Sequence, residues 1–510
     1  IGYPVMLKAA AGGGGKGMRL AWDEKELDES LQAAINEAQN AFGDGRVFIE
    51  KFIEQPRHIE IQILGDQHGH IIYVGERECS LQRRHQKVLE EAPSAFIDDE
   101  TRHEMGKQAI KLAQAVNYFS AGTVEFIVDR HKNFYFLEMN TRLQVEHPVS
   151  ELVSGLDLVE WMIRIARGEK LSLQQSHIQT NGFALEARIY AEDPIRGFLP
   201  SIGRLKQLSA PAPATKKEYQ IRVDTGVAEG SEISMHYDPM IAKLIVWAKT
   251  RELAFETMRK ALNDYQLSGI SSNIPFLSLL VCDPNIINGD ADTGYIERHF
   301  TDTLKDQFNQ INDLNPYLSL AAILWTQKTH HPNQSSIDLS VFKENIFTGE
   351  RELFAVSIKS DGSIIINQKE IDFRLLHASP SAFSSLASIK YQGQIECFQY
   401  QWHDARLTLR WNGQEANLLV MPARFSSYFL RMKPYKPKDM SKFLLSSMPG
   451  TLIKIIVSEG QEVDANQPLA IVEAMKMENI LRAPNQAIIK KIMVEQGDVL
   501  SVDQIILEYA

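Results

Sequence analysis

The chain has few cysteines, no long hydrophobic run and no excess of positive charge. Its three cysteines, Cys79, Cys282 and Cys397, lie far apart and form no CxxC pair. Neither a disulfide framework nor a zinc knuckle is therefore predicted, and a reducing compartment is expected. No apolar run approaches the ~18 residues that a membrane span needs. The net charge of -11 lacks the basic footprint of a nucleic-acid-binding protein, so neither membranes nor nucleic acids are expected partners.

What is present is a chain of 510 residues, 44% hydrophobic and 23% charged, which is typical of soluble globular proteins. At about 150 residues per domain, this length predicts three or four domains. The chain opens with Ile1 rather than Met, and its first residues have the pattern of a buried strand that enters a glycine-rich turn. We therefore expect that a front portion is missing, so the lack of a targeting signal here carries no information.

Apolar periodicity predicts where the helices lie and where the domains divide. A helical period is found at 24–41, 99–116, 155–167, 251–265 and 318–325, with strand patterns between them. Strands follow the last of these helices as far as residue 431, which favours a small barrel or sandwich. The segment RMKPYKPKDMSK, residues 431–442, has two prolines, four lysines and no periodicity, as expected of a stiff linker.

The last part of the chain contains an internal repeat. The segment 453–460 recurs in outline at 490–497, a period of 37 residues, which predicts two similar halves of a β sandwich. The halves join close to Ala474–Glu478, so a hairpin turn there would present Lys476 at one end of the module. Most lysines are ordinary surface residues, but a lysine in a turn at a repeat junction is presented at the end of the module and not packed.

A glycine-rich loop follows the first predicted strand, Val5 to Leu7. Its four consecutive glycines, Gly12 to Gly15, let backbone N–H groups close around an anion without interference from Cβ atoms. Lys8 and Lys16 add positive charge on both sides. The loop lacks the GK[ST] ending of a P-loop and the GxGxxG spacing of a dinucleotide fold. A flexible turn is the alternative, but the paired lysines favour a lid over phosphates.

Two glutamates face each other in a predicted hairpin. If the turn lies between His131 and Lys132, then Glu125 and Glu138 are directly opposite, and like charges in that position are destabilising. A hard divalent cation between them removes the repulsion, and Asn140, on the same face as Glu138, offers another oxygen. The alternative is a solvent-facing strand pair without a metal. Beside a phosphate-binding loop, the pattern favours a site for ATP and Mg²⁺.

A third pattern suits a small planar anion. In an extended chain, Arg142, Gln144 and Glu146 point to one side and offer a forked cation, an amide and a carboxylate. Arginine binds such an anion bidentately, and the glutamate can take a proton from it. Charged alternation on an edge strand is the alternative and would be preferred if this pattern stood alone. Taken alone, the basic segment 82–87 is expected to be a solvated loop. His58 and His85 are candidate phosphate contacts, with an ordinary surface or core histidine as the alternative.

The order of the motifs resembles that of a known family. KAAAGGGGKGM, EKFIEQPRHIEIQ, ERECSLQRRHQKVLEEAP, FLEMNTRLQVEHPVSE and EARIYAEDP stand in the order found in biotin carboxylases, which are ATP-grasp enzymes. SMPG at 447–450 and EAMKMEN at 473–479 resemble the biotinyl carrier domain. A carboxylase and its carrier on one chain are similar to the α subunits of biotin-dependent acyl-CoA carboxylases.

The resemblance implies an α+β multidomain chain. Its expected parts are a partial ATP-grasp domain at 1–150, the biotin carboxylase C-terminal domain at 151–302, a β-barrel-plus-helix subunit-contact domain at 311–431, a linker at 432–443 and a β-sandwich, lipoyl-like biotinyl domain at 444–510. In the family an N-terminal α/β domain and another ATP-contacting lysine precede the residue that matches position 1. The subunit-contact assignment rests mainly on position in the chain.

The resemblance also implies roles for individual residues. ATP would be bound by Lys8, Gly13, Gly14, Gly15, Gly17, Glu50, His58 and His85, and Mg²⁺ or Mn²⁺ by Glu125, Glu138 and Asn140. Bicarbonate would be bound by Lys87, Arg142, Gln144 and Val145. Glu146 would deprotonate bicarbonate for attack on the γ-phosphate of ATP, and Arg188 would stabilise the biotin enolate that takes up the CO₂. Together with these two, Lys87 and Arg142 form the expected catalytic set.

Lys476 would carry covalent biotin, attached by biotin protein ligase. Met475 and Met477 match the motif that this ligase recognises, whereas the lysine of the related lipoyl domains typically follows aspartate. Segments 197–208 and 221–244, and DMSKFLLSSMPG, resemble propionyl-CoA carboxylase α subunits more than methylcrotonyl-CoA ones.

The expected partner is a separate carboxyltransferase β subunit, because no region of carboxyltransferase size remains in the chain. This also disfavours a pyruvate carboxylase. Alternatives are an α subunit for methylcrotonyl-CoA or acetyl-CoA, or a truncated chain that acts only as a carrier and binding module. The cytoplasm of a bacterium or the mitochondrial matrix of a eukaryote is the expected location.

Overall fold

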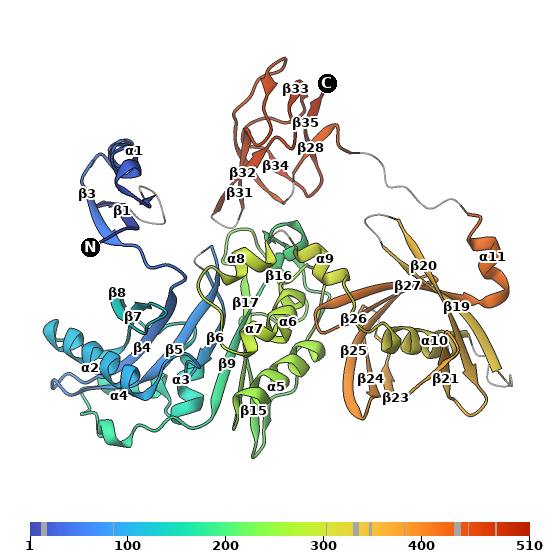
Figure 1. The fold of residues 1–510 in the computed structure, drawn as a ribbon, viewed down its shortest axis with the longest axis horizontal. Coiled ribbons are helices and arrows are strands. Elements are labelled where there is room, and N and C mark those ends of the chain that lie inside the picture. The colour runs from blue at the N-terminus through green and yellow to red at the C-terminus, as the bar shows by residue number, and fades with distance from the viewer. Residues whose placement is uncertain are drawn as a thin grey trace.

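A computed structural model gives the fold in four parts (Figure 1). It describes residues 1–11, 18–84, 86–301, 303–329, 336–345, 349–381, 383–432, 440–446, 448–474 and 477–510. A small N-terminal lobe and a small C-terminal sandwich lie above a central α/β body, and a barrel with an enclosed helix lies beside that body. Among the described residues, no helix has the length and apolar character needed to cross a bilayer.

The N-terminal lobe is a three-stranded antiparallel sheet with one helix, in the order β2-β1-β3. Its elements are β1 (Val5–Ala9), β2 (Met18–Ala21), α1 (Glu24–Phe42) and β3 (Val47–Lys51). The side chain of Asp23 caps the start of α1 by accepting hydrogen bonds from the backbone N–H groups of Lys25 and Glu26. The helix ends at Gly43, whose φ of 72° is the left-handed value that glycine adopts without strain. The helix predicted for 24–41 is therefore confirmed.

The central body is built on one nine-stranded antiparallel sheet, in the order β14-β15-β17-β9-β6-β5-β4-β7-β8. Its strands are β4 (Arg57–Gly65), β5 (Ile71–Arg83), β6 (Gln86–Ala92), β7 (Ser120–Val128), β8 (Phe134–Asn140), β9 (Phe183–Tyr190), β14 (Ala214–Thr215), β15 (Tyr219–Thr225) and β17 (Met240–Ala248). The pairing of β6 with β9 joins the part predicted as ATP-grasp to the part that follows. Polar side chains at this junction are buried because both faces of the sheet are covered.

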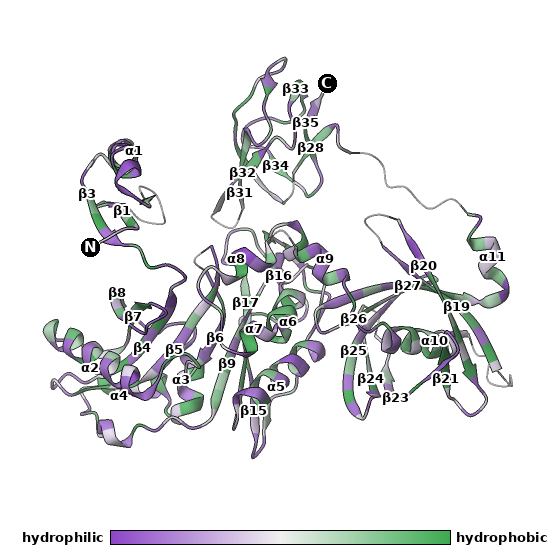
Figure 2. Ribbon diagram, in the orientation of Figure 1, coloured by the Kyte–Doolittle hydropathy of each residue, from purple (hydrophilic) through white to green (hydrophobic). Residues whose placement is uncertain are grey.

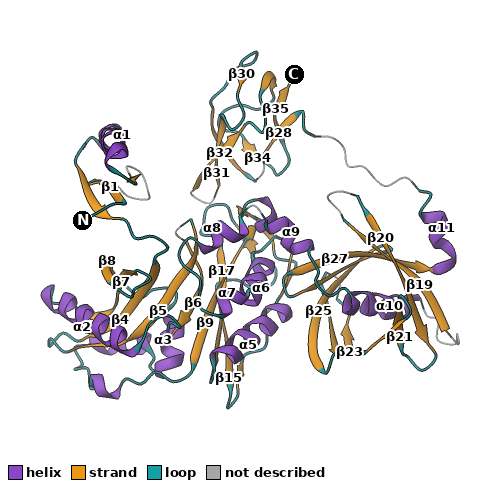
Figure 3. Ribbon diagram, in the orientation of Figure 1, coloured by secondary structure: helices purple, strands orange, loops and turns teal. Residues whose placement is uncertain are grey.

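Helices cover this sheet, and Figure 3 shows them along it. They are α2 (Asp99–Ala115), α3 (His147–Ser154), α4 (Leu158–Ala166), α5 (Arg251–Asp264), α6 (Ile274–Cys282), α7 (Pro284–Ile287), α8 (Tyr295–Phe300) and α9 (Leu304–Asn309). The helix predicted for 155–167 starts later, at Leu158, because Asp157 caps it. Figure 2 shows β17 and α6 largely in the colour of hydrophobic residues, which agrees with their place in the largest core cluster.

Short elements connect these strands and helices. They are η1 (Gln175–His177), β10 (Glu192–Asp193), η2 (Pro194–Arg196), β11 (Leu199–Pro200), β12 (Gly203–Arg204), β13 (Gln207–Ser209), β16 (Glu232–Ile233) and β18 (Gln266–Ser268). The pairs β10–β11, β12–β16 and β13–β18 each form a small two-stranded sheet.

The barrel is a second nine-stranded antiparallel sheet, in the order β22-β21-β20-β19-β27-β26-β25-β24-β23. It comprises α10 (Asn315–Thr329), β19 (Ser336–Glu344), β20 (Arg351–Lys359), β21 (Ile364–Ile366), β22 (Lys369–Ile371), β23 (Phe373–Ser379), β24 (Ser385–Tyr391), β25 (Gln394–His403), β26 (Arg406–Trp411), β27 (Gln414–Pro422), η3 (Ala423–Phe425) and α11 (Ser426–Phe429). Tyr317, Leu320 and Ala321 of α10 are fully buried against the sheet. The predicted barrel with a helix is therefore confirmed.

The C-terminal sandwich consists of two four-stranded sheets, β28-β35-β33-β30 and β32-β31-β29-β34. Its strands are β28 (Phe443–Leu445), β29 (Gly450–Ile455), β30 (Glu462–Val463), β31 (Pro468–Ala474), β32 (Met477–Arg482), β33 (Ala487–Ile492), β34 (Val499–Leu500) and β35 (Ile505–Tyr509). The strands β33, β34 and β35 begin 37 residues after β29, β30 and β31. The period found in the sequence is therefore the period of the fold, and the predicted sandwich of two similar halves is confirmed.

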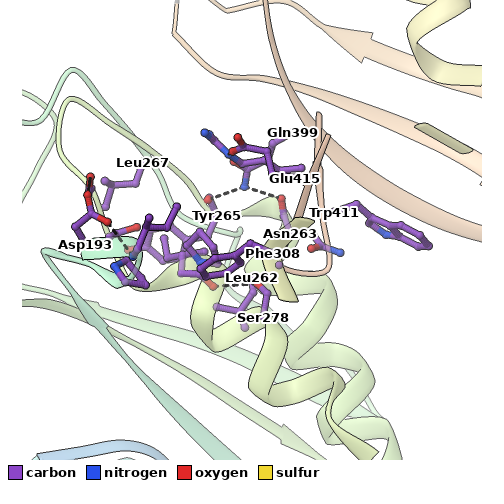
Figure 4. A pocket seen from close by; sticks show the side chains of 18 of the residues that line it. Asp193, Leu262, Asn263, Tyr265, Leu267, Ser278, Phe308, Gln399, Trp411 and Glu415 are labelled. Carbon is purple, nitrogen blue, oxygen red and sulfur yellow. Dashed lines mark hydrogen bonds and ion pairs between the residues drawn. The ribbon is translucent and has the colours of Figure 1, made fainter. Parts of the chain in front are cut away.

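A buried ion pair joins the central body to the barrel. Arg259 of α5 donates two hydrogen bonds, of 2.7 and 2.9 Å, to the two carboxylate oxygens of Glu396 on β25. Trp411 Nε1 donates to the same carboxylate at 3.0 Å. Nearby, Gln399 Nε2 donates to the backbone oxygens of Asn263 and Tyr265, beside a cavity of about 280 Å³ between the two parts (Figure 4). The junction is thus a polar contact with specific partners.

Substitution Glu396→Gln is expected to weaken this junction, because it leaves Arg259 partly buried without a counter-charge. Removal of one partner of a buried pair costs about 3–5 kcal/mol. Differential scanning calorimetry should show the barrel melting earlier and apart from the central body. The control Glu352→Gln changes an exposed glutamate on β20 and should keep the wild-type profile. Identical profiles for the two variants would refute a stabilising role of the pair.

Candidate active site

The centre of the large sheet contains a fully buried arginine. Arg77 Nε donates to Glu60 Oε1 at 2.5 Å, and its other nitrogens donate to Gln62, Thr123 and Ser150 at 2.7, 3.0 and 2.9 Å. Burial by itself raises the pKa of Glu60, but Arg77 and Lys87 lower that pKa to about 2. Glu60 is therefore a fixed negative charge inside the sheet, and Arg77 ties β4, β5, β7 and α3 together around it.

Lys87, near the start of β6, lies among three carboxylates. Its Nζ is 2.5 Å from Glu60 Oε2, 2.5 Å from Glu146 Oε1 and 3.3 Å from Glu125 Oε1. Burial by itself lowers the pKa of Lys87, but the acidic groups around it, with Glu60 and Glu146 the strongest of the carboxylates, hold that pKa above its ordinary value. The lysine is therefore a permanent cation at this site.

Glu146 is held between two cations. It is fully buried at the start of α3, with Lys87 on Oε1 and Arg188 NH2 at 2.8 Å from Oε2. Arg188 also donates through Nε to Glu90 Oε1 at 2.5 Å. A carboxylate that accepts a hydrogen bond on each oxygen keeps one orientation.

The expectation that residues 142–146 form an extended strand is wrong. They form an irregular turn that leads into α3, and Glu146 itself precedes the first helical residue. The turn still brings the predicted groups together, because Arg142 NH1 donates to Gln144 Oε1 at 2.9 Å. Val145 contributes its backbone oxygen, which accepts a hydrogen bond from Lys243 Nζ at 2.8 Å. Pro148 at the second helical position explains why a helix and not a strand begins here.

The predicted hairpin of facing glutamates is confirmed. Glu125 on β7 pairs directly with Glu138 on β8. Asn140 Nδ2 lies 2.8 Å from Glu125 Oε1 and 3.3 Å from Glu138 Oε1, so the three side chains share one spot. Burial by itself raises the pKa of Glu125, but the hydrogen bond from His58 and the charge of Lys87 lower it to about 2.

These three residues fit a hard divalent cation, because they offer two carboxylates and an amide oxygen on one face. His58, Glu60 and Glu125 also bring ligand atoms within 4.8 Å of one another. Glu125 belongs to both groups, and in the second group the oxygens of Glu60 are also engaged, by Arg77 and Lys87.

The expected nucleotide residues lie on two separate sheets. Lys8 on β1 and Glu50 on β3 form an ion pair in the N-terminal lobe, which Figure 1 shows apart from β7 and β8. His58 on β4 lies 3.0 Å from Glu125 Oε2 in the central body. The predicted residues Gly13, Gly14, Gly15, Gly17, His85 and Lys476 fall outside the residues that the structure describes.

The sequence did not single out Glu60, Arg77, Glu90, Glu186 or Lys243. Glu90 and Glu186 are direct cross-strand partners on β6 and β9, and both are fully buried. Among the described residues, Glu90 Oε2 and both oxygens of Glu186 have no hydrogen-bond partner. Burial raises the pKa of Glu90 to about 7 and, with the help of Glu90, raises the pKa of Glu186 well above its ordinary value. For Glu186, its place in the largely apolar strand FALEARIY is the signal that could have identified it.

Glu186→Gln is expected to change how stability depends on pH. The folded protein keeps a proton on Glu186 that the unfolded chain loses above its ordinary pKa, so wild-type stability falls as the pH rises from 5 towards the raised pKa. One such proton contributes a slope of about 1.4 kcal/mol per pH unit. Chemical unfolding at pH 5.5, 6.5 and 7.5 should show a shallower slope for Glu186→Gln. The control Glu100→Gln, on the exposed side of α2, should keep the wild-type slope, and parallel lines for all three proteins would contradict the account.

Three family models match the chain. Residues 1–174 match the carbamoyl-phosphate synthase L chain ATP-binding domain, residues 186–298 the biotin carboxylase C-terminal domain, and residues 443–508 the biotin-requiring enzyme domain.

Solved structures with similar folds are biotin carboxylases. The biotin carboxylase domain of the Hydrogenobacter thermophilus 2-oxoglutarate carboxylase, in complex with MgADP, ADP and bicarbonate, is 49% identical with a TM-score of 0.54. The match covers 59% of this chain and 65% of that chain, which is slightly less than two thirds of it. The pyruvate carboxylase of Rhizobium etli is 37% identical with a TM-score of 0.54, over 63% of this chain and 28% of that one.

Named relatives match over all or nearly all of this chain and over more than two thirds of their own length. The propionyl-CoA carboxylase alpha chain of Ruegeria pomeroyi is 47% identical over 100% of this chain and 78% of the relative. The human mitochondrial propionyl-CoA carboxylase alpha chain is 41% identical over 100% of this chain and 71% of the relative. The mitochondrial methylcrotonoyl-CoA carboxylase subunit alpha of Rattus norvegicus is 39% identical over 98% of this chain and 71% of the relative. The chain belongs to the family of propionyl-CoA carboxylase alpha chains, which are biotin-dependent carboxylases.

Proposed function

We propose that the protein is a ligase that uses ATP and bicarbonate to carboxylate biotin carried on its own Lys476. A separate β subunit then transfers the carboxyl group to an acyl-CoA, which we infer to be propionyl-CoA. The observation that carries this proposal is the burial of Glu146 between Lys87 and Arg188. A general base that must act on an anion needs such cations, because they hold base and anion together against their repulsion.

Bicarbonate would bind next to Glu146. Lys87 provides a fixed positive charge, and Arg142 provides a fork of N–H donors that matches a planar anion. Gln144, which bonds to both Arg142 and Glu125, would set the position of that fork. Val145 would line the same site through its backbone, which Lys243 holds in place.

Glu146 would act as the base. Its carboxylate takes the proton of bicarbonate, and the resulting dianion attacks the γ-phosphorus of ATP as ADP departs with the electron pair of the broken P–O bond. The product, carboxyphosphate, supplies CO₂ and inorganic phosphate. Arg188 lies on the other oxygen of Glu146 and is the cation that would stabilise negative charge on the acceptor.

ATP and its metal would bind at the edge of the same site. Glu125, Glu138 and Asn140 would hold Mg²⁺ or Mn²⁺, which neutralises charge on the phosphates when bound. Lys8, the loop with Gly13, Gly14, Gly15 and Gly17, Glu50, His58 and His85 would contact the nucleotide. Since Lys8 and Glu50 belong to the N-terminal lobe, the lobe would serve as a lid over the phosphates.

Glu146→Gln is the sharpest test of the base. The amide keeps the shape but cannot accept a proton, so bicarbonate-dependent ATP hydrolysis with free biotin should fall by about 10²–10⁴-fold. Binding of a fluorescent ATP analogue should change little. The matched control is Glu100→Gln, which should hydrolyse ATP at the wild-type rate. Substantial hydrolysis by Glu146→Gln would refute the assignment, and an inactive wild-type protein would favour a module that only carries biotin.

Lys476 is the expected site of biotin attachment. Intact-mass measurement after co-expression with a biotin protein ligase should show one biotin adduct, because the flanking methionines match the ligase motif. Lys476→Arg should show none, while Lys490→Arg, which changes an exposed lysine of the other half, should keep the adduct. A lipoylated or unmodified Lys476 would contradict the proposal.

The names of the relatives support a proposal for the partner and the location. We infer a hetero-oligomer with a carboxyltransferase β subunit, contacted through the barrel at 311–431. Methylcrotonyl-CoA and acetyl-CoA remain the alternative acceptors, and a comparison of the three with the reconstituted β subunit distinguishes them. The names of the eukaryotic relatives place those proteins in mitochondria. We infer a mitochondrial matrix location for a eukaryotic source and a cytoplasmic one for a bacterial source.

A further inference from the structure

Within the part of the chain that the structure describes, a short loop of the central body contacts the C-terminal sandwich. This docking loop, residues 193–202, contains η2 and β11 and lies beneath the sandwich in Figure 1. Arg196 NH2 forms an ion pair with Asp503 of the sandwich. Leu199 packs against the apolar core of the sandwich. A charged contact and an apolar contact from neighbouring residues thus meet one face of the sandwich.

The docking loop has a fixed shape. Phe198 has a φ of 62°, which is a strained conformation for a bulky residue. Its backbone N–H donates to Asp193 O at 2.7 Å, and its ring lies 4.1 Å from the guanidinium of Arg83 and 4.8 Å from the ring of Phe276. Strain of this kind persists only where surrounding contacts hold it, so the loop presents Arg196 and Leu199 in a set arrangement.

The matching surface of the sandwich is also fixed. Asp503 has a φ of 61°, and its backbone N–H donates to Ser446 O at 2.8 Å. Pro449 and Val502 line a groove together with Arg196, Leu199 and Pro200. The internal repeat gives a comparison, because Asn466 stands 37 residues before Asp503 and has a φ of 68°. The two halves therefore have the same turn, and at this position only the half that meets the docking loop has an acidic residue.

The contact is weak enough to be reversible. The side chains of Arg196 and Asp503 are 37% and 60% exposed, so water and salt screen their attraction. A groove of about 460 Å³ between the two surfaces shows that they do not pack closely. A carrier that must leave for a second site requires such a contact, since a tightly packed interface would hold it in place.

The docking loop is also linked to the active site. Arg83, at the end of β5, donates to Glu192 Oε2 at 3.3 Å, and Glu192 pairs with Pro200 of the loop. On its other side Arg83 pairs with Gln86, the residue before Lys87. One arginine thus contacts the loop that receives the sandwich and the hairpin that supplies Lys87.

We propose that residues 193–202 are the surface on which the protein's own biotin carrier domain docks for carboxylation, with Arg196 and Leu199 receiving the face formed by Asp503, Pro449 and Val502. This proposal rests on the proposed function, because it takes the sandwich to be the biotin carrier. Arg196 acts here as a positioning residue. It orients the carrier domain and does not touch the reacting groups.

The test compares free biotin with the attached carrier in the biotinylated full chain. Arg196→Glu places a negative charge against Asp503, so transfer of labelled bicarbonate to the protein's own carrier should slow by about fivefold. Hydrolysis of ATP with free biotin should stay within twofold of wild type. Arg196→Lys should keep near-normal transfer, and addition of Asp503→Asn to Arg196→Glu should relieve the repulsion and recover most of the rate. The control Asn466→Asp adds a charge to the equivalent turn and should have no effect.

Hydrogen exchange of residues 193–202 measures docking without any chemistry. Exchange should be faster in Arg196→Glu than in wild type and should slow again in the double variant. Unchanged exchange and unchanged carrier labelling in Arg196→Glu would overturn the docking surface. A wild-type protein without bicarbonate-dependent ATP hydrolysis would instead overturn the proposed function, and the exchange result would still decide whether this contact forms.

Discussion

The rest of the site depends on one electrostatic constraint, namely that buried cations and buried carboxylates must neutralise each other. Arg77, Lys87 and Arg188 lie inside a sheet covered on both faces, where an unpaired charge is very costly. Glu60 pairs with Arg77 and Lys87, and Glu146 pairs with Lys87 and Arg188. Each carboxylate is therefore shared by two cations. The sharing fixes the side chains before any substrate arrives, and it holds Glu146, the proposed base, in one orientation between Lys87 and Arg188.

The same constraint explains how the parts of the chain are joined. Arg77 in the central body is fully buried and paired with Glu60, and Arg259 at the contact with the barrel is partly buried and paired with Glu396. At the contact between the sandwich and the central body, the ion pair of Arg196 with Asp503 is exposed. The contact with the barrel is therefore the firmer of the two, and the weaker contact belongs to the domain that we propose to be the mobile carrier. The two contacts differ because the charges of Arg259 and Glu396 are more deeply buried than those of Arg196 and Asp503.

Much of this could be predicted from the sequence because it depends on spacing. The facing of Glu125 and Glu138 follows from the position of a turn, and the 37-residue period of the sandwich is visible in its glycines and apolar runs. The buried network could not be predicted in this way. Glu60 alternates with isoleucines in HIEIQIL, a pattern that normally puts the polar side in water. Only the folded structure shows that the face of β4 with Glu60 is covered. In the same way, only the tertiary fold brings Arg188 to Glu146.

The central claim is that bicarbonate, activated by Glu146, attacks the γ-phosphorus of ATP at this site. The most direct measurement follows ¹⁸O from labelled bicarbonate through turnover with biotin and ATP. If the oxygen of bicarbonate forms the new bond to phosphorus, the inorganic phosphate should contain one ¹⁸O atom. Inorganic phosphate without label, formed at the same rate, would show that water attacks instead, and it would contradict the account.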